Sequence, residues 1–348
     1  MTDKDSRSIE VKQLQIADRS RWDAFIDASE QATFFHRSGW QQVVEEACAH
    51  PTYYLYAETD NRICGVLPLG HVRSRFFGNA LISMPFCVSG GIVAESEMAF
   101  SALEDAACKL AEQLEVDYLE MRNFERKHPR WISKDLYVSF QKFIDPNPQA
   151  NLNAVPRKQR AMIRKGIKAE LAIEINQDTE QFFAIYSESL RNLGTPVMSS
   201  KYFRFLKNIF GDACEVLTVT KNGRPIAAVM SFYYRDQVLP YYGGGNREAR
   251  QLKANDFMYW QLMLRASQRG VRIFDYGRSK KGTGSYDFKK NWGFSPRALQ
   301  YEYYLVKARR MPDVSPLNPR YRLSITLWQH MPLSLSRMLG PMIARNLA

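Results

Sequence analysis

The chain contains NRICGVLPL at residues 61–69 and GRPIAAVMSF at residues 223–232. Each stretch begins with residues that favour a tight turn and continues as a run of apolar and β-branched side chains. Such a run predicts the second strand of a β-hairpin. A pattern that occurs twice in one chain indicates a duplicated structural unit.

Two further features recur in the same order after each hairpin strand. A glycine-containing strand end leads into a helical pattern of apolar residues, and a short strand that ends in charge follows. In the first half of the chain the three features lie at 61–69, 88–114 and 117–122, and in the second half at 223–232, 241–268 and 274–278.

The spacing of the repeated features also agrees. Arg62 and Asp117 are 55 residues apart, and Arg224 and Asp275 are 51 residues apart. The repeat therefore predicts an α+β protein made of two similar domains, each with a mixed central sheet. Two unrelated α/β domains are the alternative.

The prolines mark the expected boundaries. Pro146 and Pro148 break secondary structure ahead of a basic helix, so we expect a first domain over residues 1–148 and a second over 149–310. Residues 311–348 form a predicted tail, which prolines at 312, 316, 319, 332 and 341 divide into short helices.

Composition excludes several classes of protein. The five cysteines are scattered and form no C-x-x-C pair, which argues against a disulfide framework and a zinc site. The polar N-terminus does not resemble a secretion signal, and no apolar run reaches the length of a spanning helix. We expect a cytoplasmic protein with no metal and no tightly bound cofactor. Its net charge of +12 favours an anionic partner, although a basic surface also confers solubility.

A one-signed basic segment follows the predicted boundary. Arg157, Arg160, Arg164 and Lys168 fall on one stripe of a helix, and no acidic residue occurs between Arg157 and Ala169. Guanidinium groups suit phosphate oxygens, so Arg160 and Arg164 are candidate phosphate-binding residues. The alternative is a solvated helix face.

The most specific motif lies near the end of the second predicted domain. It reads FDYGRS at residues 274–279, then GTGSYDFKKNWG at residues 282–293. This pattern resembles the motif that closes the second domain in the FemAB family. TFFHRSGW at residues 33–40 and GTPVMS at residues 194–199 resemble further landmarks of that family. The similarity extends over nearly the whole chain and is closest to a subgroup associated with exopolysaccharide and PEP-CTERM/exosortase systems.

The resemblance implies a fold and an activity. The fold is two tandem GNAT-like domains, that is, the acyl-CoA N-acyltransferase fold. The activity is transfer of an acyl or aminoacyl group, from acyl-CoA or aminoacyl-tRNA as co-substrate, to an amine on a cell-envelope or exopolysaccharide precursor. Two alternatives stay open: a CoA-dependent N-acetyltransferase acting on an amino sugar, and a noncatalytic nucleic-acid or membrane-surface adaptor.

Acyl transfer to an amine needs a donor or cation at the carbonyl oxygen that becomes negative. With the resemblance, Lys289 is the candidate cation, expected on a strand or strand end, and Tyr286 is a candidate proton relay. Without it, Lys289 is better explained as a solvent-facing strand lysine. Asp275 is a candidate base, although an ion pair with Arg278 is the commoner role for such a carboxylate.

Other residues near the motif are candidates for binding substrate. Arg278 and Ser279 end the predicted strand. Phe288 and Trp292 could form an aromatic wall for the substrate, although aromatic residues at this spacing more often belong to a core.

A second cationic cluster precedes the predicted helix at 254–268. Arg247, Arg250 and Lys253 lie just before Asn255, and a helix N-terminus with cations suits phosphate. Lysine and asparagine stand here where coenzyme A acetyltransferases have small residues, which argues against coenzyme A. Asn255 has the N-cap of the helix as its alternative role.

The tail is basic and amphipathic. Residues 314–348 contain four arginines, no acidic residue and many large apolar side chains. Such a segment suits an anionic inner-membrane surface. The alternative is that the tail packs on the first domain or across a dimer.

Overall fold

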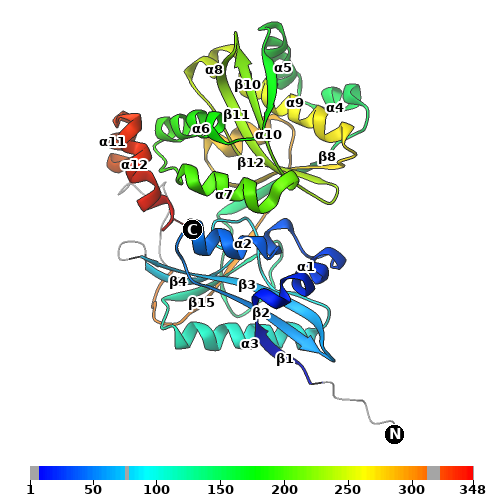
Figure 1. The fold of residues 1–348 in the computed structure, drawn as a ribbon, viewed down its shortest axis with the longest axis vertical. Helices are drawn as coiled ribbons and strands as arrows, with labels where there is room; N and C mark the ends of the chain where they lie inside the picture. Colours follow the sequence, from blue (N-terminus) through cyan, green and yellow to red (C-terminus); the bar gives the residue numbers. More distant parts are fainter. Residues whose placement is uncertain (1–7, 75–77, 312–321, 348) are drawn as a thin grey trace. The chain divides into compact units, whose positions relative to one another are not determined.

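The computed structural model describes residues 8–74, 78–311 and 322–347 (Figure 1). The described chain forms two compact units. Unit 1 takes the residues up to Asp135, the segment from Leu299 to residue 311, and residues 345–347. Unit 2 takes residues 136–298 and 322–344. Each unit is built around its own mixed sheet, as the repeat predicts.

Unit 1 has the strand order β1-β2-β3-β4-β6-β15-β7, with β5 paired to β3. Its elements are β1 (Glu10–Gln13), η1 (Ile16–Asp18), α1 (Arg19–Ala28), η2 (Phe34–His36), α2 (Gly39–Gln42), η3 (Val43–Ala47), β2 (Thr52–Thr59), β3 (Arg62–Ser74), β4 (Gly78–Ser83), β5 (Val93–Ala94), α3 (Glu97–Gln113), β6 (Tyr118–Asn123), β7 (Ile132–Lys134) and β15 (Gln300–Leu305).

Helix α3 packs on the sheet of unit 1. The side chain of Ser96 accepts a hydrogen bond from the amide of Ala99 and caps the helix N-terminus. Leu103 and Ala107, which lie one turn apart, are fully buried in the same core cluster as Leu67 and Leu119 of the strands. The helical pattern of the first half thus forms the helix that it predicts.

Unit 2 has the strand order β14-β8-β13-β12-β11-β10-β9. Its elements are β8 (Tyr137–Phe143), α4 (Pro148–Ala154), α5 (Arg157–Lys168), β9 (Ala172–Asn176), α6 (Glu180–Leu193), α7 (Ser200–Phe210), η4 (Gly211–Ala213), β10 (Cys214–Lys221), β11 (Arg224–Tyr234), β12 (Gln237–Gly245), α8 (Arg247–Leu252), α9 (Ala254–Gln268), β13 (Ile273–Lys280), α10 (Gly284–Asn291), β14 (Pro296–Ala298), α11 (Arg322–His330) and α12 (Leu333–Ala344).

Helices cover both faces of the unit 2 sheet. Val229 of β11 belongs to a core cluster that includes Met258 and Leu262 of α9. Phe232, three residues further along β11, points to the opposite face and meets Phe210 of α7 with ring centroids 5.6 Å apart. Helix α9 therefore packs on one face, and α7 on the other.

Both repeated hairpins turn through left-handed residues. Asp60 and Asn61 have φ values of 49° and 60°, and Asn222 and Gly223 have φ values of 51° and 74°. Two consecutive positive φ values match the tight turn that suits the twist of a hairpin. The predicted hairpin strands at 61–69 and 223–232 are confirmed as parts of β3 and β11.

The boundary between the units differs from the expected one. The units divide between Asp135 and Leu136, not at residue 148, because β8 pairs with β13 and β14 in the sheet of unit 2. The chain then returns to unit 1 after residue 298, where β15 lies between β6 and β7. These pairings join residues far apart in the sequence, so the prolines did not indicate them.

The tail forms two short helices against α6 (Figure 1). A Cβ atom on Gly194 would meet the side chain of Ile325 of α11 at 2.5 Å, and one on Gly340 of α12 would meet the carbonyl oxygen of Val197 at 2.8 Å. The described tail helices thus pack on unit 2. Pro332 separates α11 from α12, but Pro341 lies inside α12 and does not divide it. The prolines at 312, 316 and 319 lie outside the described residues.

Among the described residues, no helix combines the length and the apolar character needed to cross a membrane.

Candidate active site

Two neighbouring strands in the middle of the unit 2 sheet pair only at their beginnings. Parallel strands β12 and β13 pair at Gln237 with Ile273 and at Val238 with Phe274, and no further pair is formed. Beyond these positions β12 continues to pair with β11 alone, and β13 with β8 alone. Beyond Val238 and Phe274, β12 and β13 therefore do not pair with each other, an unusual feature for the centre of a sheet.

A bulge in β12 coincides with this separation. The register between β11 and β12 shifts between Met230 and Ser231, which face Tyr242 and Pro240, so Tyr241 is the extra residue. A bulge bends and twists its strand. We call residues 239–245 and 275–280, along which β12 and β13 do not pair with each other, the open interval.

The glycines at the end of β12 let α9 approach closely. A Cβ on Gly243 would lie 2.6 Å from the hydroxyl of Tyr259, and a Cβ on Gly245 would lie 2.6 Å from Oδ1 of Asn255. Larger residues at either position would push α9 away from the open interval. The glycine run that the sequence repeat singled out is thus a site of close packing between strand and helix.

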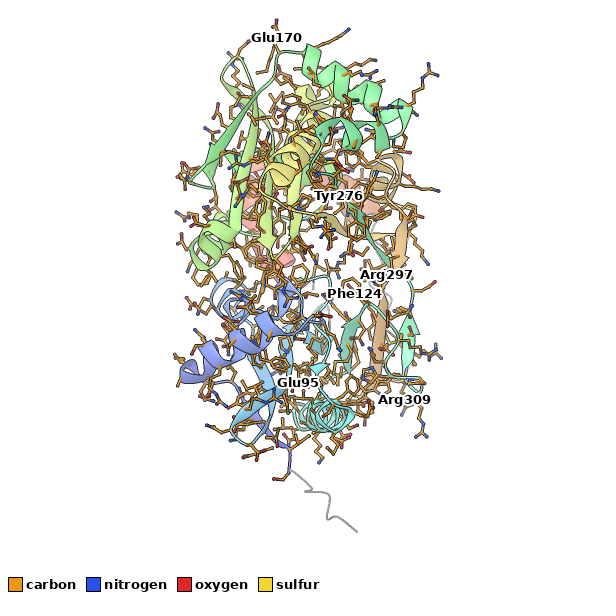
Figure 2. All side chains as sticks on the ribbon, turned by 90° about the vertical axis from the view of Figure 1, so that its right-hand side faces the viewer. Glu95, Phe124, Glu170, Tyr276, Arg297 and Arg309 are labelled. Carbon is orange, nitrogen blue, oxygen red and sulfur yellow. The ribbon has the colours of Figure 1, made fainter. Side chains whose placement is uncertain are left out.

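Among the described residues, several buried polar atoms at the open interval have no hydrogen-bond partner, and two of them lie near the contact between the interval and α9. They are the hydroxyl oxygen of Tyr276 and Oδ1 of Asn255. Burial raises the pKa of the Tyr276 phenol well above its ordinary value, so the phenol stays protonated. Figure 2 shows Tyr276 inside unit 2. Buried polar groups normally have partners, so these two atoms are candidates for contact with a ligand.

Lys289 lies on helix α10, whereas the sequence predicted a strand or strand end. The side chain of Thr283 accepts from the amide of Tyr286 and caps this helix, which the Gly282-Thr283-Gly284 loop introduces. From α10 the ammonium of Lys289 reaches strand β13. It donates to the carbonyl oxygens of Tyr276, Gly277 and Arg278 at 2.7, 3.2 and 2.9 Å.

Those three carbonyls belong to a second bulge. The register between β13 and β8 shifts between Asp275 and Arg278, and Gly277 has a φ of 64°. The carboxylate of Asp275 accepts from the amide of Gly277 at 2.7 Å and from Nε2 of Gln141 at 2.8 Å. Lys289 and Asp275 thus fix the bulge from different sides, and the hydrogen bonds of Asp275 go to Gln141 and Gly277 rather than to Arg278.

Burial changes the pKa values of both groups. It lowers the pKa of the Lys289 ammonium to about 7, which the Asp275 carboxylate opposes and the Arg278 guanidinium reinforces. It raises the pKa of the Asp275 carboxyl, against its two hydrogen bonds and the charge of Lys289. Only the charged form of Lys289 supplies three N–H donors, so loss of its proton removes one hydrogen bond to the bulge.

Three other residues of the motif, Tyr286, Arg278 and Ser279, differ in their contacts. The ring of Tyr286 packs edge-on against Phe140, with centroids 5.4 Å apart. The guanidinium of Arg278 lies over the ring of Tyr137, 4.9 Å from its centroid. Ser279 is buried, and its hydroxyl has no hydrogen-bond partner among the described residues.

The predicted aromatic wall belongs to the core. Trp292 has no exposed surface, and its indole donates to Asp256 at 3.2 Å. Phe288 is partly buried and packs against Trp292 and Tyr259 in the same cluster. The substrate-wall prediction is wrong for Trp292, because a fully buried indole presents no surface to a substrate.

The beginning of α9 differs from its predicted form. The N-cap is Lys253, with a left-handed φ of 59°, and Asn255 lies inside the first turn, so the N-cap role expected for Asn255 is wrong. Lys253 is half-buried. Arg247 and Arg250 are exposed on α8, the short helix that precedes α9.

Helix α5 packs across this first turn of α9. A Cβ on Gly166 would lie 2.7 Å from Cβ of Phe257 and 3.1 Å from the carbonyl oxygen of Lys253. Gln159 of α5 donates to the buried carboxylate of Asp256, whose pKa burial raises. This pair was not predicted from the sequence, although Gln159 shares the buried face of α5 with Ile163 and Gly166. A polar residue on such a face is a signal for a buried partner.

The opposite side of α5 carries the basic residues. Arg157, Arg164 and Lys168 are exposed, as are Lys158 and Lys165, and none of the five forms an ion pair within the described part of the chain. Arg160 is half-buried and lies 3.5 Å from Oδ1 of Asn153. The predicted helix and its basic stripe are confirmed, whereas phosphate binding by Arg160 and Arg164 stays a prediction.

A hollow of about 250 Å³ lies between β8, β13 and β14, lined by Gln141, Phe143, Ile273 and Arg297 among others, and Lys289 does not line it. The described residues contain no cluster of three His, Cys, Asp or Glu side chains that could hold a metal ion.

Comparison with known proteins places this site within a described domain type. Residues 155–290 match the family model described as Acetyltransferase (GNAT) domain. This range contains α5, the open interval and Lys289. No curated protein sequence matches the chain.

Solved structures extend the likeness to both units. The crystal structure of FemX has a TM-score of 0.67 at 14% identity and covers 90% of this chain and 99% of that chain. The C-terminal domain of a putative lysylphosphatidylglycerol synthetase from Agrobacterium fabrum has a TM-score of 0.56 at 12% identity, covering 82% and 91%. A tandem GNAT protein from the clavulanic acid biosynthesis pathway has a TM-score of 0.55 at 13% identity, covering 88% and 100%. The chain therefore has a tandem GNAT-like fold, and its residues 155–290 carry a match to the GNAT acetyltransferase domain.

Proposed function

We propose that unit 2 transfers an aminoacyl group from a charged RNA to an amine on a cell-envelope or exopolysaccharide precursor. The observation that carries the proposal is the open interval between β12 and β13. Where two strands of a sheet separate, an extended ligand can bind between them through backbone hydrogen bonds. An activated acyl group in the interval would lie beside the hydroxyl of Tyr276 and Oδ1 of Asn255, which have no partner among the described residues.

The reaction needs few groups. The amine nitrogen of the acceptor attacks the ester carbonyl of the donor, and a tetrahedral intermediate forms with negative charge on its oxygen. Collapse breaks the bond to the ribose oxygen, forms the amide, and passes the proton of the amine to the departing hydroxyl. The protein has to hold the two reactants, stabilise the oxygen and relay the proton.

Lys289 serves this reaction through the bulge in β13. Its three N–H donors are all bound to the carbonyls of Tyr276, Gly277 and Arg278. In trans peptides the N–H points away from the C=O of the same peptide unit, so the ammonium orients the amides of residues 277–279 toward the other side of the strand. Lys289 is therefore a positioning residue, and Asp275 holds the same bulge. Tyr286 remains the candidate proton relay.

The choice of donor rests on the first turn of α9. A coenzyme A pyrophosphate would need the amides of a helix N-terminus. Here Gly166 of α5 lies against the carbonyl of Lys253, and the carboxylate of Asp256 is buried in the same turn. A bound pyrophosphate would face both a packed helix and a like charge. This arrangement favours a donor held elsewhere.

The exposed face of α5 offers such a place. Its five exposed cations form no ion pair with described residues, so they are available to phosphates. Phosphate contacts by arginine and lysine supply most sequence-independent RNA affinity. The basic helix and the open interval belong to the same unit, so one RNA could contact α5 while its aminoacyl end lies in the interval.

Incubation with each donor tests the proposal. The purified chain is mixed with a precursor pool and either aminoacyl-tRNA or acetyl-CoA, and the products are analysed by mass spectrometry. An aminoacyl mass increase on an amine supports the proposal. An acetyl increase on an amino sugar would support the CoA-dependent alternative instead, and RNA binding without any product would favour a noncatalytic adaptor.

A further inference from the structure

The two tail helices carry large apolar side chains that are exposed. Leu323 and Leu327 of α11 have 71% and 62% of their surface exposed, and Leu335 and Met338 of α12 have 38% and 63%. Leu323 and Leu327 are four residues apart and Leu335 and Met338 three, so each pair lies on one side of its helix. We call these four residues the tail stripe.

The opposite sides of both helices are fixed to unit 2. Trp328 of α11 is buried, and Ser336, Gly340 and Ala344 of α12 are buried. Arg337 donates to the hydroxyl of Ser187 at 2.9 Å and to the carbonyl of Ala184 at 3.1 Å, both on α6. Arg191 of α6 donates to the carbonyl of Met331 at 2.9 Å. The tail helices are thus held by one side, and the tail stripe points away from α6.

Charge distinguishes the partners that such a surface could bind. Residues 314–348 contain four arginines and no aspartate or glutamate. Single exposed apolar residues are ordinary, but a group of them on short helices of a segment without acidic residues is the pattern of an interfacial helix. A bilayer with anionic headgroups attracts a segment that has only positive charges, and it accepts exposed apolar side chains. A second copy of this chain would bring another segment of positive charge to the same place.

We infer that α11 and α12 dock unit 2 on an anionic membrane surface, with the tail stripe entering the headgroup region. The helices have nine and twelve residues, so they lie along the interface. Because α11 and α12 are bound to α6, the docking places the whole of unit 2 at the bilayer. The inference concerns binding alone and does not depend on the transfer reaction.

Vesicle flotation of the full chain tests this inference. Phosphatidylglycerol vesicles at low salt are compared with phosphatidylcholine vesicles. Wild type binds the anionic vesicles, and Leu327→Gln/Met338→Gln reduces the bound fraction about tenfold because both changes remove exposed apolar surface. The matched control Ile16→Gln/Met98→Gln changes two side chains of unit 1 that are 81% and 65% exposed, and it binds as wild type does.

Three results would overturn the inference. Wild type could fail to float with anionic vesicles, or the tail double variant could float as wild type does. Light scattering could instead reveal a wild-type dimer that the tail double variant converts to a monomer, without vesicle binding by either. Circular dichroism of both double variants checks that they are folded, since all four changed residues are exposed.

Discussion

The ammonium of Lys289 lies 2.7 Å from the carbonyl oxygen of Tyr276. It also donates hydrogen bonds to the carbonyl oxygens of Gly277 and Arg278 in the same bulge. One side chain on α10 thus determines the backbone conformation of β13 where that strand leaves β12. Lys289 and Asp275 together bind the backbone of β13 at the bulge, where β13 no longer pairs with β12.

Removal of this ammonium should slow transfer. Lys289→Met keeps the length of the side chain but releases the three carbonyls, so the bulge loses its geometry. We expect kcat to fall about 100-fold, as for the loss of one preorganised contact to the transition state, with little change in KM. Steady-state kinetics measure this split. Lys289→Arg, which retains the charge and several donors, should recover part of the rate, and a rise in KM alone would contradict the positioning role.

The protonation of Lys289 should also be visible in stability. The native protein releases this proton near pH 7, whereas the unfolded chain holds it to about pH 10.5. Between these values the unfolded chain binds more protons, so this group makes the free energy of unfolding rise with pH. Denaturant titrations from pH 6 to pH 10 should give a wild-type curve that rises relative to that of Lys289→Met. Parallel curves would mean that Lys289 keeps an ordinary pKa in the folded protein.

The contact between α5 and α9 should be sensitive to one added side chain. Gly166→Val places atoms within contact distance of Phe257 and of the carbonyl of Lys253. We expect the free energy of unfolding to fall by about 1–3 kcal/mol, as for other overpacked sites. Urea denaturation measures the change. Ala161→Val, at an exposed position of the same helix, controls for the helix propensity of valine and should cost much less.

The exposed face of α5 should govern RNA binding. Arg164→Glu/Lys168→Glu should weaken tRNA binding and reduce the slope of log affinity against log salt by about 2, or about 1 for each lost phosphate contact. Fluorescence anisotropy at several salt concentrations measures both effects. The control Lys201→Glu/Arg224→Glu changes the net charge equally at exposed positions outside α5. Equal losses for both variants would assign the binding to net charge and not to α5.

Local patterns predicted much of the fold. The helix at 254–268 has the predicted bounds, and the basic stripe from Arg157 to Lys168 lies on a helix as predicted, because the spacing of like residues is a property of neighbouring residues. The hairpin turns at Asn61 and Gly223 were predicted for the same reason. The positions of prolines predicted the ends of helices less well, since Pro341 lies inside α12.

Contacts between distant residues could not be predicted. Gln159 and Asp256 are 97 residues apart, and the sequence around either residue does not indicate the other as its partner. The pairing of β8 with unit 2 and of β15 with unit 1 likewise depends on the sheets that these strands complete. The strand expected at Lys289 is wrong because Thr283 caps a new helix, α10, and Lys289 lies within that helix. The catalytic roles of Lys289, Tyr286 and Asp275 stay predictions.

The most direct test of the transfer reaction uses a charged tRNA with a radiolabelled amino acid. The purified chain, the labelled donor and an amine-bearing envelope precursor are incubated, and the precursor is isolated and analysed by mass spectrometry. The label should appear on the precursor amine with the mass of one aminoacyl group, and Lys289→Met should abolish most of it. Label that stays on the tRNA with wild type, while acetyl-CoA yields an acetylated precursor, would contradict the proposed donor; no product from either donor would contradict the transferase itself.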